Sequence, residues 1–227
     1  MSTEPGSVLD PAGPPRRVAL VLARYGAGPA APTGVSPAEL ARAALADSYE
    51  VLADLVGVRS GIAGPAAVTT LLWPGGLRRP DVSVGELASG LAGEADELVV
   101  VAADVPDLPA LVLAKAFKVL HRSDAVVAPA RTGGGCVALG LRLPLARWLA
   151  GMDLDLDADL VARLTAAAPA RGLVAAAPDW HRLRTPADLR RLDPGLEGWE
   201  ETRALLEGTP GSSRNSVAAA PAAGGVG

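Results

Sequence analysis

The segment of this sequence with the clearest chemical potential is 99–109, in which an apolar run stops at a carboxylate. The β-branched run before Asp104 has no polar alternation, which is typical of a strand covered on both faces. Ligands of open α/β sheets bind at the carboxyl ends of such strands. Asp104 is therefore a candidate catalytic residue and a candidate ligand for Mg²⁺ or Mn²⁺, which prefer oxygen donors. Because aspartate is also common in turns, a purely structural turn is the alternative.

A second candidate lies in the loop that follows the first predicted strand. Gly26, Gly28 and Ala31 match the dinucleotide-binding pattern Gly-x-Gly-x-x-Ala, and Arg24 stands just before them. In a Rossmann site the helix begins inside this motif, so that its amino end meets the pyrophosphate. Here two prolines delay the expected helix to residue 36. The segment therefore predicts a flexible phosphate-binding loop rather than a Rossmann site.

A third candidate is the glycine-rich segment 128–136, which contains Arg131, Gly133, Gly134 and Gly135. Glycines let a backbone approach a ligand closely and expose their amides to an anion. The same residues also suit a tight turn between two adjacent strands, so this segment alone does not decide between the two interpretations.

The last candidate is segment 179–189, in which Arg182 and Arg184 precede a helix start. Thr185 is the expected helix cap, and Asp188, three residues later, is the expected reciprocal cap. Likewise Asp107 is expected to cap the helix at 110–120.

These candidates must be positioned by an alternation of strands and helices, which is the pattern of a mostly parallel sheet with helices on both faces. The sequence therefore predicts an α/β fold, a three-layer sandwich. The expected strands are 18–23, 66–72, 97–102, 125–129, 136–141 and 173–176, and the expected helices are 36–56, 84–91, 110–120, 157–167 and 186–192.

Length and composition limit the class of protein. With 227 residues, 49% of them hydrophobic, the chain can bury a full core, and we expect a single domain at 16–207. Residues 1–15 and 208–227 are rich in Pro, Gly and Ala, and predict disordered tails. Without a signal-peptide pattern or an apolar run of about 18 residues, the sequence favours a cytoplasmic protein with no membrane partner.

Charge and side-chain types argue against two further classes. A formal net charge of −4 and an aromatic content of 3% give neither the basic surface nor the stacking side chains of a nucleic-acid-binding protein. Cys136 is the only cysteine, which excludes an internal disulfide and a thiolate metal cluster. We expect Cys136 to be a small core residue.

Three motifs, taken in their order, carry a resemblance to a known superfamily. Residues 103–108 are similar to a metal-binding strand end of the form Asp-x-Pro-x-Leu. Residues 129–139 are similar to a guanylyltransferase turn, Pro-Asp-Arg-x-Gly-Thr-Gly-Thr-Asn-Ala-Leu, and residues 180–189 to a closing motif, Trp-x-Asp-Val-Asp-Thr-Pro-x-Asp-Leu. Over residues 17–193 the chain resembles the nucleotidyltransferases and nucleotide-diphospho-sugar transferases of the GT-A fold. The branches that it resembles most are the glycosyltransferase-like family DUF2064 and the phospholactate guanylyltransferases.

The resemblance implies a nucleotide-dependent transferase of GT-A type. The reaction would be nucleotidyl transfer to a phosphorylated small-molecule acceptor or glycosyl transfer from a nucleotide sugar, with Asp104 holding Mg²⁺ or Mn²⁺. The residues that would face the nucleotide are Arg24, Gly26, Gly28, Arg131, Gly133, Gly134, Gly135, Arg182 and Arg184.

The chain departs from the family at two places. Arg24 is the only basic residue in 24–35, where the family has several, and Arg182 and Arg184 stand where the closing motif has carboxylates. Loss of a carboxylate weakens a metal site, whereas guanidinium groups can pair with phosphate directly. A degenerate, non-catalytic member that binds a nucleotide or a protein partner is therefore the alternative. The sequence leaves the acceptor and the oligomeric state open.

Overall fold

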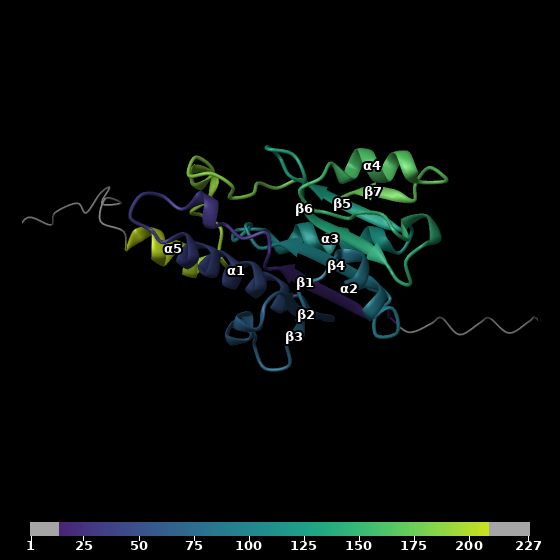
Figure 1. The fold of residues 1–227 in the computed structure, drawn as a ribbon, viewed down its shortest axis with the longest axis horizontal. Helices are drawn as coiled ribbons and strands as arrows, with labels where there is room; N and C mark the ends of the chain where they lie inside the picture. The colour runs from purple at the N-terminus through teal and green to yellow at the C-terminus, as the bar shows by residue number, and fades with distance from the viewer. Residues whose placement is uncertain (1–13, 209–227) are drawn as a thin grey trace, which may run out of the picture.

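The computed structural model describes residues 14–208 (Figure 1). The tails that the sequence predicts to be disordered, 1–15 and 208–227, lie outside the described residues except for positions 14, 15 and 208. Within the described range, no helix is long and apolar enough to cross a membrane.

The framework is a seven-stranded sheet with the order β3-β2-β1-β4-β6-β5-β7. Strand β6 runs antiparallel to its neighbours β4 and β5, and the other pairings are parallel. The strands are β1 (Arg17–Leu22), β2 (Val58–Ala63), β3 (Leu77–Arg79), β4 (Glu97–Ala102), β5 (Ala125–Pro129), β6 (Cys136–Arg142) and β7 (Val174–Ala176). This mostly parallel sheet confirms the predicted fold class.

Helices cover both faces of the sheet, which gives the three layers visible in Figure 1. One face packs against α2 (Val84–Leu91) and α4 (Leu160–Ala167), and the other against α1 (Pro37–Ala53) and α3 (Ala110–Leu120). Successive residues of β1 and β4 alternate between these two cores. Because both sets are buried, the two strands are apolar after their first residues, Arg17 and Glu97, as the sequence predicts for covered strands. A further helix, α5 (Glu200–Glu207), packs against α1.

The predicted strand at 66–72 is wrong, because Ala66–Leu71 forms a 3₁₀ helix. The hydroxyls of Thr69 and Thr70 donate to carbonyls three residues earlier, at 2.7 and 3.2 Å, and this local bonding competes with a strand ladder. The strand next to β1 is instead β2, which contains Gly61. A Cβ atom there would lie 2.2 Å from the carbonyl oxygen of Leu77, so the close approach of β3 requires glycine.

The helix predicted at 186–192 is also shorter than expected, since only Asp188–Arg191 is helical and the turn is 3₁₀. The predicted helix at 157–167 begins later, at Leu160, with Asp159 as its cap. Helix α5 was not predicted at all.

Four connections meet at one edge of the sheet. They are the loop after β1, the turn after β4, the turn between β5 and β6, and the segment after β7. Because β6 is antiparallel, it begins at the edge where the parallel strands end. All the candidate segments therefore reach the place where α/β sheets bind ligands.

Candidate functional site

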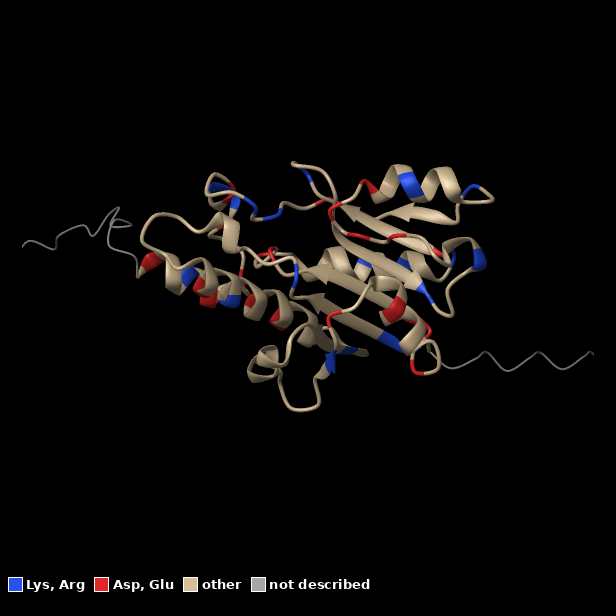
Figure 2. Ribbon diagram, viewed as in Figure 1, with Lys and Arg blue, Asp and Glu red and all other residues tan. Residues whose placement is uncertain are grey.

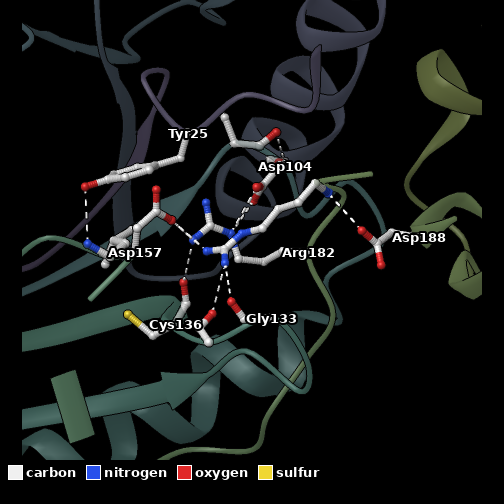
Figure 3. Close-up of polar contacts among 12 residues, drawn as sticks. Tyr25, Asp104, Gly133, Cys136, Asp157, Arg182 and Asp188 are labelled. Atoms are coloured by element: carbon white, nitrogen blue, oxygen red, sulfur yellow. Dashed lines mark hydrogen bonds and ion pairs between the residues drawn. The ribbon is translucent and has the colours of Figure 1, made fainter. Parts of the chain in front are cut away.

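Asp104 lies two residues beyond the end of β4 and is 2% exposed. Both of its carboxylate oxygens accept from Nε of Arg182, at 2.7 and 3.0 Å (Figure 3). Its backbone oxygen accepts from the N–H of Leu183 at 2.8 Å. The closing segment, residues 179–189, is thus bound to the end of β4 by both backbone and side chain.

Arg182 contacts three further groups. One terminal nitrogen donates to Oδ1 of Asp157 at 2.6 Å and to the backbone oxygen of Cys136 at 3.3 Å. Its Cζ lies 5.3 Å from the ring centroid of Tyr25, in cation–π range. Figure 3 shows this guanidinium between Asp104 and Asp157. The side chain is therefore a buried cation with fixed neighbours, rather than a surface arginine.

Asp157 joins Arg182 to Arg184. Its Oδ1 also accepts from Arg184 at 2.6 Å, and its side chain is 55% exposed. The other terminal nitrogen of Arg184 donates to the backbone oxygens of Gly133 and Gly134, at 2.9 and 3.1 Å. The charged cluster formed by Asp104, Asp157 and the two arginines therefore also holds the glycine turn.

The glycine turn has an unusual backbone. Gly133, Gly134 and Gly135 have φ values of 78°, 75° and 74°, which residues other than glycine rarely adopt. A Cβ atom on Gly135 would lie 2.5 Å from the backbone oxygen of Leu156. In the part of the chain that the structure describes, the amides of these three glycines donate to no protein acceptor. Because a trans peptide places N–H opposite C=O, the amides of Gly134 and Gly135 point away from Arg184, and such consecutive amides suit an anion.

Burial dominates the electrostatics of the site. Burial raises the pKa of Asp104, and the charge of Arg182 opposes that effect. Burial alone would lower the pKa of Arg182, but the carboxylates of Asp104 and Asp157 raise it overall. Burial also raises the pKa of Cys136 to about 12, so its thiol is no nucleophile. Cys136 is 0% exposed, which confirms the prediction of a core residue.

A pocket of 320 Å³ lies beside the cluster, between the loop after β1 and the first turn of α2. Arg24 and Tyr25 form one wall, and the tyrosine hydroxyl donates to Asp155 at 2.8 Å. Burial and this carboxylate raise the pKa of Tyr25. The other lining residues are Ser83, Val84, Gly85, Met152, Asp153, Leu154 and Asp157.

The remaining predicted residues lie outside the cluster. Arg24 pairs with Asp81 at 2.9 Å and so brings no free charge to the loop. Gly26 and Gly28 are in the same loop but do not line the pocket. Arg131 pairs with Asp179 and stacks on Trp180, 5.3 Å from the centroid.

Asp107 is not the cap of α3, because no side chain caps that helix. Its carboxylate instead accepts from the indole of Trp180 at 3.1 Å, and Nε2 of His181 lies 3.0 Å from it. Asp107 therefore fixes the closing segment one residue before Arg182. By contrast, Asp188 accepts from the N–H and hydroxyl of Thr185, at 2.9 and 2.8 Å, as predicted for a reciprocal cap. The prediction that Thr185 caps the helix is wrong, because the 3₁₀ turn begins at Asp188 after Ala187 and no side chain caps it.

The sequence interpretation missed the acidic segment before α4. Asp153, Asp155 and Asp157 alternate with buried Leu154 and Leu156, and this period of two was a readable signal for an extended, one-sided segment. Tyr25 was missed because nothing in its local sequence distinguishes it.

The arrangement does not suit a divalent metal ion at Asp104. Arg182 engages both carboxylate oxygens, and Asp157, the nearest second carboxylate, is held by two guanidiniums. Among residues 14–208, the one group of three acidic side chains close enough to hold a metal ion is Asp47, Glu50 and Glu200, where α1 meets α5. Mg²⁺ or Mn²⁺ at Asp104 stays a prediction that these contacts do not favour.

Comparison with known proteins supports the fold assignment. Residues 85–155 match the family described as "Uncharacterized protein conserved in bacteria (DUF2064)". This segment includes Asp104 but ends before the closing segment, and it spans less than half of the chain. The comparison with curated proteins found no match.

Solved structures match over most of the chain. A candidate nucleotide-diphospho-sugar transferase from Desulfovibrio desulfuricans is 20% identical, with 85% of this chain and 97% of that chain covered and a TM-score of 0.58. A 4-diphosphocytidyl-2C-methyl-D-erythritol synthase is 16% identical, with 85% and 100% covered and a TM-score of 0.54. The corresponding synthase from Anaerococcus prevotii is 9% identical, with 78% and 96% covered and a TM-score of 0.53. The fold of this chain is therefore that of the GT-A nucleotidyltransferases and nucleotide-diphospho-sugar transferases, as its motifs predicted.

Proposed function

We propose that this chain is a nucleotide-dependent transferase that binds a nucleotide or a nucleotide sugar at the carboxyl edge of its sheet. The observation that carries the proposal is the convergence at this edge of a buried carboxylate, two arginines and a glycine turn with unpaired amides, beside a 320 Å³ pocket. A pocket at this edge of an α/β sheet is the usual place for a small ligand.

The two parts of the site suit the two parts of a nucleotide. The amides of Gly134 and Gly135 offer donors to phosphate oxygens on one side of the turn, and the partly exposed Arg184 offers positive charge on the other side. The pocket beside them offers acceptors, the carboxylates of Asp153 and Asp155, to the hydroxyls of a ribose or a sugar. The phosphates would lie at the glycine turn and the neutral, hydroxyl-rich part in the pocket.

Two reactions fit such a ligand. Nucleotidyl transfer to a phosphorylated small acceptor releases pyrophosphate, and glycosyl transfer from a nucleotide sugar releases a nucleoside phosphate. In both, negative charge grows on the leaving phosphate, and fixed donors near that charge lower the barrier. Arg184 and the turn amides are the groups of this chain that would stabilise it.

Within residues 14–208, the Lys and Arg positions in Figure 2 are distributed over many elements and are not gathered on one of them. This distribution favours a small-molecule ligand over nucleic acid as partner.

A second candidate function is nucleotide binding without catalysis. The ion pair between Asp104 and Arg182 favours it, because the carboxylate best placed for chemistry is already neutralised. The two candidates share the binding site and differ only in turnover.

The test is a thermal-shift screen with GTP, CTP and UDP-glucose, with and without Mn²⁺, followed by an assay for released pyrophosphate or nucleoside diphosphate. A ligand present at 100 times its Kd adds about 2.7 kcal/mol, or about 5–10 °C in Tm for a domain of this size. A shift with product release supports the transferase, and a shift without release across a panel of acceptors supports the non-catalytic binder. No shift with any ligand would contradict both.

A further inference from the structure

The guanidinium of Arg182 occupies the position that a metal ion would take at Asp104. Nε of Arg182 lies 2.7 and 3.0 Å from the two carboxylate oxygens, and the two side chains are 2% and 3% exposed. Mg²⁺ binds oxygen at about 2.0–2.1 Å, so an ion shared by both oxygens would collide with this N–H group.

The charges of the cluster are already balanced. Two carboxylates, Asp104 and Asp157, face two guanidiniums, Arg182 and Arg184, and every one of the four is bonded to an opposite charge. A divalent ion binds where carboxylates supply excess negative charge. Here it would meet two positive groups at a neutral site.

The guanidinium of Arg182 is enclosed by other groups as well, and the side chain is 2% exposed. The ring of Tyr25 and the backbone oxygen of Cys136 contact it on other sides. The next residue, Leu183, donates its N–H to Asp104, which fixes the backbone from which the side chain extends. The cation is held by the fold itself, as a bound metal ion would be held by its ligands.

We infer that Arg182 is a built-in cation that replaces a divalent metal ion at Asp104. The inference deepens the proposed function, on which it rests only for the identity of the anionic ligand beside this centre. The phosphates of that ligand are left to Arg184 and the amides of the glycine turn.

The first test uses the unmodified protein and no nucleotide. Mn²⁺ is titrated while ¹⁵N NMR follows the backbone amides of residues 103–105 and 182–184, because a paramagnetic ion broadens the signals of nearby groups. We expect these signals to stay sharp. Broadening of these amides that the Asp104→Asn variant removes would overturn the inference.

The second test restores a carboxylate with Arg182→Asp. We expect this variant to gain a saturable Mn²⁺ site whose broadening is centred on residues 103–105, and to lose it again when Asp104→Asn is added. Arg190→Asp, an equal charge change at an exposed position in the 3₁₀ turn Asp188–Arg191, is the matched control and should gain no such site. A folded Arg182→Asp protein without the gain would count against the inference, and if that variant does not fold, the titration of the unmodified protein decides.

These titrations contain no nucleotide, so they are independent of the thermal-shift screen. If the protein binds no nucleotide, the proposed function fails, but the Mn²⁺ titration at Asp104 gives the same result. If Mn²⁺ binds at Asp104, the inference fails, but the nucleotide screen gives the same result.

Discussion

Replacing Arg182 by methionine removes the guanidinium and keeps most of the apolar stem. Asp104 then remains 2% exposed without its partner, and removing one member of a buried pair typically costs about 3–5 kcal/mol. For a domain of this size the expected fall in Tm is about 6–20 °C. Urea unfolding followed by tryptophan fluorescence measures the loss in free energy of unfolding.

The stability lost in Arg182→Met should depend on pH. Without Arg182, only the charge of Arg184 still opposes the burial that raises the pKa of Asp104 above its unfolded value. The folded variant therefore takes up a proton more readily than the unfolded chain, and its stability recovers as the pH falls through the raised pKa. We expect the gap between variant and parent to be largest at pH 8 and to shrink by pH 5.

Adding Asp104→Asn separates the charge from the packing. The double variant has no unpaired carboxylate, so it should regain part of the lost stability at pH 8 and show no recovery at lower pH. A loss below about 1 kcal/mol for Arg182→Met, or an equal loss at both pH values, would refute the idea that a buried ion pair joins these residues.

Three further predictions follow from particular contacts. Gly135→Ala should cost more than Gly134→Ala in urea unfolding, because both incur about 1–2 kcal/mol for a left-handed backbone but only the Cβ at 135 would meet a neighbouring atom, at 2.5 Å; equal losses would contradict this. Burial raises the pKa of Asp47 to about 6 from 3.8, so the stability of the parent relative to Asp47→Asn should rise by about 2–3 kcal/mol as the pH falls from 7 to 4; parallel pH profiles would count against it. Arg184→Asp should weaken nucleotide binding in metal-free buffer while Arg190→Asp leaves it near that of the parent, measured by calorimetric titration at two salt concentrations; equal effects would remove Arg184 from the site.

The fold was predictable where local pattern and tertiary environment agree. Strand β4 and helix α3 have the predicted bounds because each is a sustained apolar pattern with clear ends. Strand β2 was missed because Arg59, Ser60 and Gly61 interrupt its apolar residues. Strand β2 forms because its backbone pairs with β1 on one side and with β3 on the other, and this pairing cannot be recognised in the local sequence.

The separate segments of the site could be predicted from the sequence, but the contacts between them could not. The position of Asp104 follows from the strand before it, and the conformation of the glycine turn follows from three consecutive glycines. The contact between Asp104 and Arg182 joins residues 78 positions apart and depends on how the segment after β7 returns across the sheet edge. The local sequence shows which residue types could form such a contact, but it does not show that the two residues lie next to each other in the fold.

A buried carboxylate at the end of a strand needs a positive partner, and the partner can be an ion from solution or a side chain of the chain itself. An ion is bound only above a threshold concentration, whereas a covalently attached guanidinium is present at all times. In this chain Asp107 contacts Trp180 and His181, the two residues before Arg182, so the segment that carries the cation is itself fixed by a second buried carboxylate. The two acidic residues of the turn after β4 therefore act together: Asp107 positions the closing segment, and that segment delivers the charge that Asp104 requires. The cost of losing this charge falls on the stability of the fold, which is why unfolding as well as ligand binding reports on the role of Arg182.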